Sequence, residues 1–173
     1  NVQLVPQNRP IGAPDYAQLR SRVEGFSESR LGYMTRTIER YGFIQGSVRM
    51  LTTTSDGPPP SDAPIGRPFF LTGFQEHSTL VEGRWPLESP VIDGDGLSIE
   101  AVLGKDAARQ FGVKPGSRVE LYPFTNDPSQ SISVTITGTA DPNDSDDEYW
   151  MNSPSSYFTS FESGDQVVVP VYV

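Results

Sequence analysis

The chain has 173 residues, of which 35% are hydrophobic, enough for one ordinary globular core or two small lobes that share one. Its 22 acidic residues outnumber its 13 lysines and arginines, and the net charge of -9 argues against nucleic acids and anionic lipids as partners. Cysteine is absent, which excludes disulfides, thiol nucleophiles and thiolate metal sites. Because the 16 Gly and 16 Pro interrupt helices, we predict a β-rich α+β fold.

The N-terminal part of the chain contains a candidate helix that starts at Pro14-Asp15. Four apolar residues then recur at helical spacing and would share one face: Tyr16, Leu19, Val23 and Phe26. Residues 31–54 are rich in β-branched and aromatic side chains and predict two or three strands. Residues 55–68 hold five prolines, so we expect an exposed loop or hinge there, before a strand resumes at 69–71.

The C-terminal part begins with a predicted hairpin loop at residues 93–96, Asp-Gly-Asp-Gly, followed by a strand over 98–103. Residues 104–111 predict a short helix, which Gly112 would cap. A turn at 114–116 leads into two further strands, whose predicted inward residues are Val119 and Leu121 in the first and Ile132, Val134 and Ile136 in the second. Residues 141–164 are too irregular to predict.

Catalytic and metal-binding patterns are weak in this sequence. His77 is the only histidine, and no Gly-x-Ser-x-Gly elbow accompanies it, so we interpret it as a solvated or hydrogen-bonded side chain. The acidic segment 141–148 offers oxygen ligands at alternate positions, as calcium loops do. It departs from the EF-hand pattern at Asp146, where glycine is needed, and at Asn152, where glutamate is needed. A solvated acidic loop is therefore favoured, and no catalytic residue, metal ligand or cofactor is predicted.

Aromatic residues gather beside this acidic segment, among Ser, Asn and Pro. If exposed, such rings would suit a partner-binding surface, and the candidate residues are Tyr149, Trp150, Tyr157 and Phe158. The alternative is that the rings pack beneath their own loop, because large aromatic side chains are mostly buried. Exposure of the rings decides between these two interpretations.

Several pieces of the region 77–142 occur in an order that resembles the extracytoplasmic domain of FtsX/MacB-type ABC-transporter permeases. They are Leu80-Val81-Glu82-Gly83-Arg84-Trp85-Pro86, then Glu100-Ala101-Val102-Leu103, then residues 107–121 (Ala-Ala-Arg-Gln-Phe-Gly-Val-Lys-Pro-Gly-Ser-Arg-Val-Glu-Leu), and finally Ile136-Thr137-Gly138-Thr139-Ala140-Asp141-Pro142. The chain has Ser117 directly after Gly116, at a position where the family more commonly has aspartate. The unit in which a helix is followed by Gly-x-x-Pro-Gly and then a strand also occurs in small β-barrels of the AbrB and double-psi kind.

The resemblance implies two lobes, a porter-like lobe from residues 1–76 with 143–173 and a sabre-like lobe from residues 77–142. It implies a non-catalytic domain on the extracytoplasmic face of the plasma membrane, periplasmic or extracellular. Such a domain couples membrane-helix movement, driven by a separate nucleotide-binding ATPase subunit, to an extracytoplasmic protein or a lipid-linked substrate. A single closed ring of strands would count against a relay between two lobes.

The ends of the sequence agree with a piece of a larger membrane protein. The chain opens at Asn1 without an initiator Met or signal peptide, and it stops on the apolar run 167–173, which is typical of a strand inside a fold. No stretch approaches the roughly 20 apolar residues of a spanning helix, so we expect the piece itself to be soluble. Two other function classes stay open, a calcium- or carbohydrate-binding extracellular module and a hydrolase that uses paired carboxylates.

Overall fold

The computed structural model divides into two compact units, residues 1–39 and residues 40–173, which are described separately. The predicted class is confirmed, since strands dominate and only a few short helices accompany them in the second unit. The structure describes residues 13–31, 41–43, 49–51, 60, 62–87, 91–93, 96–122, 131–150 and 153–173.

The first unit contains the predicted helix, α1, which runs from Ala13 to Leu31. Asp15 lies in its first turn and Arg30 in its last, where each charge opposes the helix dipole. Arg20 and Glu24 form an ion pair one turn apart, at 3.1 Å. Across the described residues, α1 included, there is no helix with both the length and the apolar character needed to cross a membrane.

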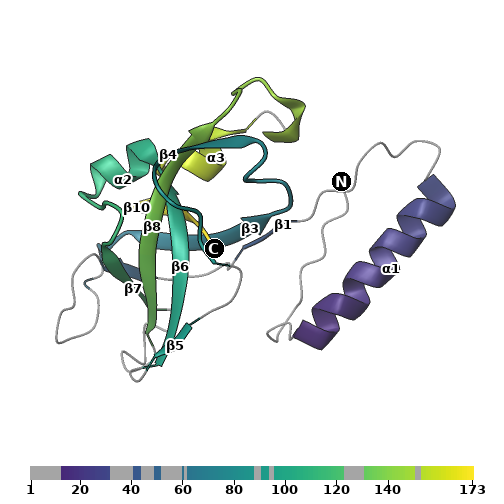
Figure 1. Ribbon diagram of the computed structural model, residues 1–173, viewed down its shortest axis with the longest axis horizontal. Helices are drawn as coiled ribbons and strands as arrows, with labels where there is room; N and C mark the ends of the chain where they lie inside the picture. The colour runs from purple at the N-terminus through teal and green to yellow at the C-terminus, as the bar shows by residue number, and fades with distance from the viewer. Residues whose placement is uncertain are drawn as a thin grey trace. The chain divides into compact units, whose positions relative to one another are not determined.

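The second unit holds ten strands among its described residues, together with short helices (Figure 1). The strands are β1 (Tyr41–Phe43), β2 (Arg49–Leu51), β3 (Ile65–Leu71), β4 (Ser78–Gly83), β5 (Val91–Asp93), β6 (Gly96–Gly104), β7 (Arg118–Tyr122), β8 (Ile132–Pro142), β9 (Phe161–Ser163) and β10 (Gln166–Tyr172). The helices are α2 (Lys105–Gln110), the 3-10 helix η1 (Glu148–Trp150) and α3 (Ser155–Phe158).

Six of these strands close into a ring. The order is β3, β2, β7, β8, β6, β10 and back to β3, with parallel pairing between β6 and β8 and between β10 and β3. The other four strands each extend one ring strand: β1 pairs with β3, β4 with β8, β5 with β6 and β9 with β10. Figure 1 places α2, α3 and β4 toward one end of the ring and β5 toward the other.

The expected lobe boundaries at 76/77 and 142/143 do not coincide with this architecture. Leu103 of β6 lies opposite Val171 of β10, and Leu121 of β7 lies opposite Met50 of β2, so sheet pairing crosses both boundaries. Residues 77–142 therefore form part of one continuous sheet with the chain on either side. The division between compact units falls between residues 39 and 40 instead.

Two hydrophobic clusters fill this unit, on opposite faces of strands β6 and β10. The aliphatic core contains Ala101, Leu103, Ala107, Ala108, Val113, Val119, Leu121, Val134, Ile136, Val169 and Val171. The aromatic core contains Phe69, Leu71, Phe74, Val102, Ala140, Tyr149, Trp150 and Phe158, with Leu80, Trp85, Tyr157 and Tyr172 packed against it. Along β6, Ala101 and Leu103 face the first cluster while Val102 faces the second, as the alternation of a strand requires.

Two prolines occupy strands of the ring, and one of them corrects the prediction for residues 55–68. Pro68 was placed in an exposed loop, but it belongs to β3, where it lies opposite Val171. On its other side, β3 pairs with β2 at Ile65 and with β1 from Phe69 onward. Pro68 therefore lies between these two neighbouring strands, at a position where neither of them pairs with β3. A residue without an amide hydrogen fits such a position in a sheet.

Pro170 repeats this arrangement in β10, which lies beside β3. On one side it lies opposite Arg67 of β3. On the other side, β9 pairs with β10 as far as Val168, and β6 takes over at Val171. Residues 65–67 also belong to β3, so the loop prediction is wrong from Ile65 onward. Residues 55–59 and 61 lie outside the described residues, and the loop prediction there stays a prediction.

The predicted turns of the C-terminal part are confirmed. After α2, Gly112 has a φ of +63°, its amide donates to Arg109 O at 3.2 Å, and the amide of Val113 donates to Ala108 O at 2.9 Å. This pair of bonds is a Schellman cap, which favours glycine at the left-handed position. Lys114 O then accepts from the Ser117 amide at 2.9 Å, with Gly116 at a φ of +92°, the geometry of a turn with proline second and glycine third.

Candidate functional site

The structure places the four predicted partner-binding residues in or beside the aromatic core. Trp150 is fully buried, and Phe158 and Tyr149 are 5% and 9% exposed. Tyr157 is half-buried. The rings therefore pack beneath their own chain segment, and the prediction that they present a partner-binding surface is wrong for the three buried residues, because their apolar faces are already in contact with other rings.

Phe74 is the ring at the centre of this cluster. It stacks on Tyr172 with centroids 4.1 Å apart and on Phe158 at 5.2 Å. Trp150 and Trp85 approach it edge to face, at 5.8 and 6.1 Å. Offset stacks and edge contacts are the favoured arrangements for aromatic pairs. The cluster thus anchors η1 and α3 to the ring of strands.

The acidic segment forms a turn around polar contacts of its own. The backbone amide of Asp146 donates to Asp144 Oδ1 at 2.9 Å, and the indole Nε1 of Trp150 donates to Asp144 O at 3.0 Å. Asp147 uses both carboxylate oxygens, one for the Tyr149 amide at 2.9 Å and one for His77. Among the residues that the structure describes, no three His, Asp or Glu side chains converge as a metal-binding group.

His77 lies between the turn that follows β3 and the acidic segment. Its Nδ1 donates to Asp147 Oδ2 at 2.7 Å, and its ring stacks on Tyr149 with centroids 3.8 Å apart and planes 3° from parallel. The prediction of a hydrogen-bonded histidine is therefore confirmed. The backbone bond from Tyr149 and, after it, the bond from His77 hold the pKa of Asp147 below its usual value, because both favour the ionised carboxylate.

Arg84 and Glu100 form a second polar contact, which the sequence did not indicate because the two residues lie 16 positions apart. The guanidinium donates twice to the carboxylate, at 2.7 and 2.5 Å, and Glu100 also accepts from the Leu87 amide at 3.0 Å. The hydrogen bond with Arg84 is the main cause that lowers the pKa of Glu100, and the same bond raises the pKa of Arg84. The contact holds residues 84–87 against β6.

Glycines allow close backbone contacts at two places beside these residues. Gly83 has a φ of +81°, and a Cβ there would lie 2.1 Å from Thr137 O. A Cβ on Gly104 would lie 1.7 Å from Phe158 O, so the backbone of α3 rests directly on the end of β6. Any side chain at either position would require the backbone to move.

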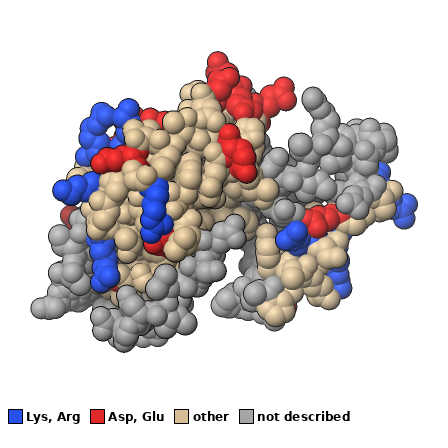
Figure 2. Space-filling model, viewed as in Figure 1, with Lys and Arg blue, Asp and Glu red and all other residues tan. Residues whose placement is uncertain are grey.

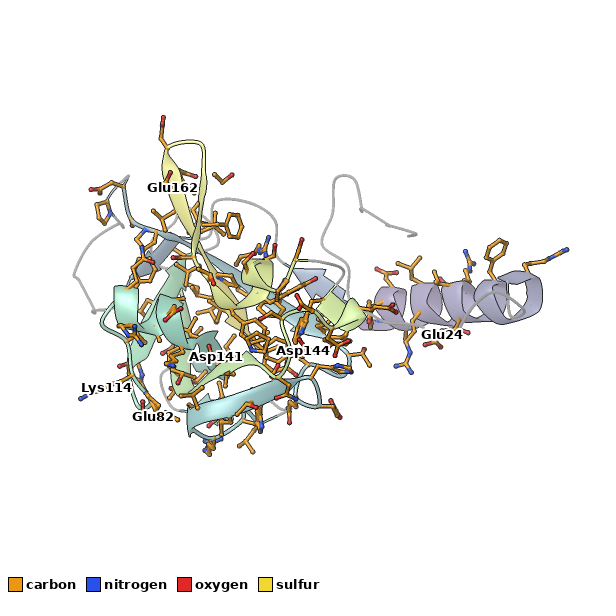
Figure 3. All side chains as sticks on the ribbon, turned by 90° about the horizontal axis from the view of Figure 1, so that it is seen from above. Glu24, Glu82, Lys114, Asp141, Asp144 and Glu162 are labelled. Carbon is orange, nitrogen blue, oxygen red and sulfur yellow. The ribbon has the colours of Figure 1, made fainter. Side chains whose placement is uncertain are left out.

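Charge is distributed unevenly over the second unit. Figure 2 shows basic side chains over the α2 and β7 side and acidic side chains over the segment that follows β8. The exposed basic residues are Lys105, Arg109, Lys114 and Arg118, and the exposed acidic residues of that segment are Asp144, Asp146 and Glu148. In Figure 3, Glu162 lies on the β9–β10 hairpin, well apart from Asp141 and Asp144.

Comparisons of this chain with protein-family models, with curated proteins and with solved structures return no significant match.

Proposed function

We propose that this chain is the non-catalytic extracytoplasmic domain of an ABC-transporter permease of the FtsX/MacB type. In this role it transmits movement of membrane helices, driven by ATP hydrolysis on a separate nucleotide-binding subunit, to an extracytoplasmic protein or a lipid-linked substrate. It performs no bond chemistry of its own. The order of the motif pieces in residues 77–142 is the observation that carries the proposal.

The local geometry of the motif residues supports a mechanical rather than a chemical role. Gly83 permits a close approach to Thr137, Gly112 caps α2, and Gly116 completes a turn. Each of these residues is required by the backbone and leaves no functional group for catalysis. A rigid body with fixed turns is suited to transmitting a displacement.

The closed ring counts against a relay between the two lobes that the resemblance implies, so the proposal keeps a relay only between the ring and the N-terminal unit. Because sheet pairing joins residues 77–142 to the strands β2, β3 and β10, that region does not move against the rest of the ring. The moving bodies are instead the ring as a whole and the N-terminal unit that contains α1. The contact surface for the partner is the exposed acidic segment with Asp144, Asp146 and Glu148, rather than the buried aromatic rings.

Distance measurements between spin labels test this proposal directly. The chain has no cysteine, so pairs introduced into a cysteine-free parent permease label only the chosen sites. One pair joins the two units, Gln18→Cys on α1 and Ser163→Cys on the β9–β10 hairpin, both at exposed positions. The matched control lies within the second unit and pairs Lys114→Cys, in the turn before β7, with Ser163→Cys.

In vesicles that contain the permease and its ATPase, ATP should shift the distance distribution of the first pair and leave that of the control unchanged. An unchanged first pair would contradict the relay. A shift in the control pair would instead contradict the rigidity of the second unit. Absence of membrane-spanning segments beside this domain in the parent protein would overturn the assignment as a permease.

A further inference from the structure

The turn after β3 and the acidic segment are held together by several polar contacts. His77 O accepts from the Asn143 amide at 3.0 Å, and Glu76 O accepts from Asn143 Nδ2 at 2.9 Å. Thr72 O accepts from the Tyr149 hydroxyl at 2.7 Å. These contacts involve groups that keep the same charge near neutral pH. They define a fixed frame that does not respond to mild acid.

One contact of this frame can change its charge near neutral pH. His77 donates to Asp147 at 2.7 Å, and histidine is the side chain whose charge ordinarily changes between about pH 5 and 8. The side chains of His77 and Asp147 are 37% and 33% exposed, so protons from solvent reach both. The stack on Tyr149 places the imidazole over the face of a phenol ring, an arrangement that attracts a cation.

The charged residues of the turn and of the acidic segment beside His77 are all acidic, and one of them, Asp141, is paired with Lys105 of α2 at 3.7 Å. Asp147 contacts it directly, Glu76 precedes it on the turn, and the acidic segment adds Asp144, Asp146 and Glu148. Residues 72–77 and 141–150 contain neither lysine nor arginine. A protonated imidazole is therefore the one cation that these two segments themselves can supply.

We propose that His77, Asp147 and Tyr149 form a pH-sensitive latch, which holds the acidic segment to the turn after β3 more tightly when the imidazole is protonated. Because Asp147 is ionised, the neutral imidazole already donates a charge-assisted hydrogen bond to it, and protonation adds the attraction of an ion pair. It also offsets part of the repulsion among the neighbouring carboxylates. Loss of the proton weakens the latch and leaves the remaining frame in place.

The latch has an acidic limit as well as an alkaline one. Asp147 has a lowered pKa in the folded protein, so its contribution is present above the unfolded value and is lost as the pH falls through the folded value. On the alkaline side, loss of the imidazole proton removes the ion pair and leaves the hydrogen bond from the neutral ring to the carboxylate. The latch is therefore tightest in mild acid.

Hydrogen exchange of the complete 173-residue chain tests the latch. The probes are the Tyr149 amide, which donates to Asp147, and the Trp150 indole, which donates to Asp144 O. Protection factors are compared at about pH 5.5 and pH 7.5, after correction for the intrinsic pH dependence of exchange. The Val134 amide, in the core strand β8, reports on global unfolding at each pH.

Protection of both probes should be about threefold higher at the lower pH, since a charged partner strengthens a hydrogen bond by that order. His77→Gln should remove the difference, because glutamine can donate but does not titrate. Asp147→Asn should remove it too, while Asp165→Asn, in the turn between β9 and β10, should retain it.

Equal protection of the probes at the two pH values in the unmodified chain would overturn the proposal. The same pH dependence in His77→Gln as in the unmodified chain would also overturn it. If either variant lost protection at Val134, the unmodified chain and the Asp165→Asn control would still decide the question. The latch does not depend on the transporter proposal, so either can fail alone.

Discussion

The aliphatic core and the aromatic core lie on opposite faces of β6 and β10, but they are assembled in different ways. The aliphatic core draws on alternating residues of neighbouring strands, such as Val134 and Ile136 of β8, and on one side of α2. The aromatic core draws one ring each from β3, from the turn after it and from β10, and two rings each from η1 and from α3. A regular pattern encodes the first core, whereas contacts between distant segments build the second.

This difference explains why the sequence predicts one core directly and leaves the other open between a buried cluster and a partner-binding surface. An alternating run implies a buried face without knowledge of its neighbours. Tyr149, Trp150 and Phe158 stand among polar residues, and only the closed ring brings Phe74 and Tyr172 against them. The polar atoms of the segment are also satisfied locally, as the Trp150 indole bond to Asp144 O illustrates.

The sharpest way to test the comparison is to remove the most buried ring of the aromatic core. Trp150→Ala should lower the free energy of unfolding by about 3–5 kcal/mol, because it removes a fully buried indole and leaves a cavity. Urea unfolding followed by circular dichroism measures the loss. Trp85→Ala is the matched control, since Trp85 is only half-buried and should cost less. Equal losses would contradict the central role of Trp150.

The cap of α2 tests the edge of the aliphatic core. Gly112→Ala should lower the free energy of unfolding by about 1–2 kcal/mol, because its φ is +63° and an added Cβ has nothing within 4 Å. The cost is then conformational and not steric. Gly25→Ala, in the interior of α1 with equally open surroundings, should not reduce stability. Thermal unfolding of both variants would reveal whether the left-handed conformation matters.

A conservative change inside the aliphatic core should have a smaller effect than the loss of Trp150. Ile136→Val removes one methyl group from a fully buried site and should cost about 0.5–1.5 kcal/mol in urea unfolding. Ile132→Val removes the same group from a half-buried site of the same strand. A larger loss at Ile132 than at Ile136 would show that the centre of this core lies elsewhere.

The smallest effect should come from the polar edge of the aromatic core. Asp147→Asn should lower the melting temperature at about pH 6 but not at about pH 2, because a carboxyl with a lowered pKa stabilises only while it is ionised. Asp165→Asn is the matched control, because it also removes one carboxylate but at an exposed turn position. A deficit for Asp147→Asn that persisted undiminished at the lower pH would indicate lost packing and not lost charge.

The sequence was most informative where a local pattern determines the structure. The hairpin that pairs Asp93 with Gly96, the cap at Gly112 and the inward residues of β7 and β8 follow from turn chemistry and alternation. Pro68 was misplaced because a proline can occupy a strand where its neighbours change, which depends on the pairing of other strands. The Arg84–Glu100 pair was missed for the same reason, since neither residue has a local signal.

The contact at Gly104 has a consequence for anyone who wishes to transplant or shorten the segment that carries η1 and α3. Since the Phe158 carbonyl occupies the space where a side chain at residue 104 would begin, the two regions constrain each other although more than fifty positions separate them. A chimera that borrows this segment must also carry a glycine at the receiving strand. Without it, the insert would be held away from the host and its rings would be left in water.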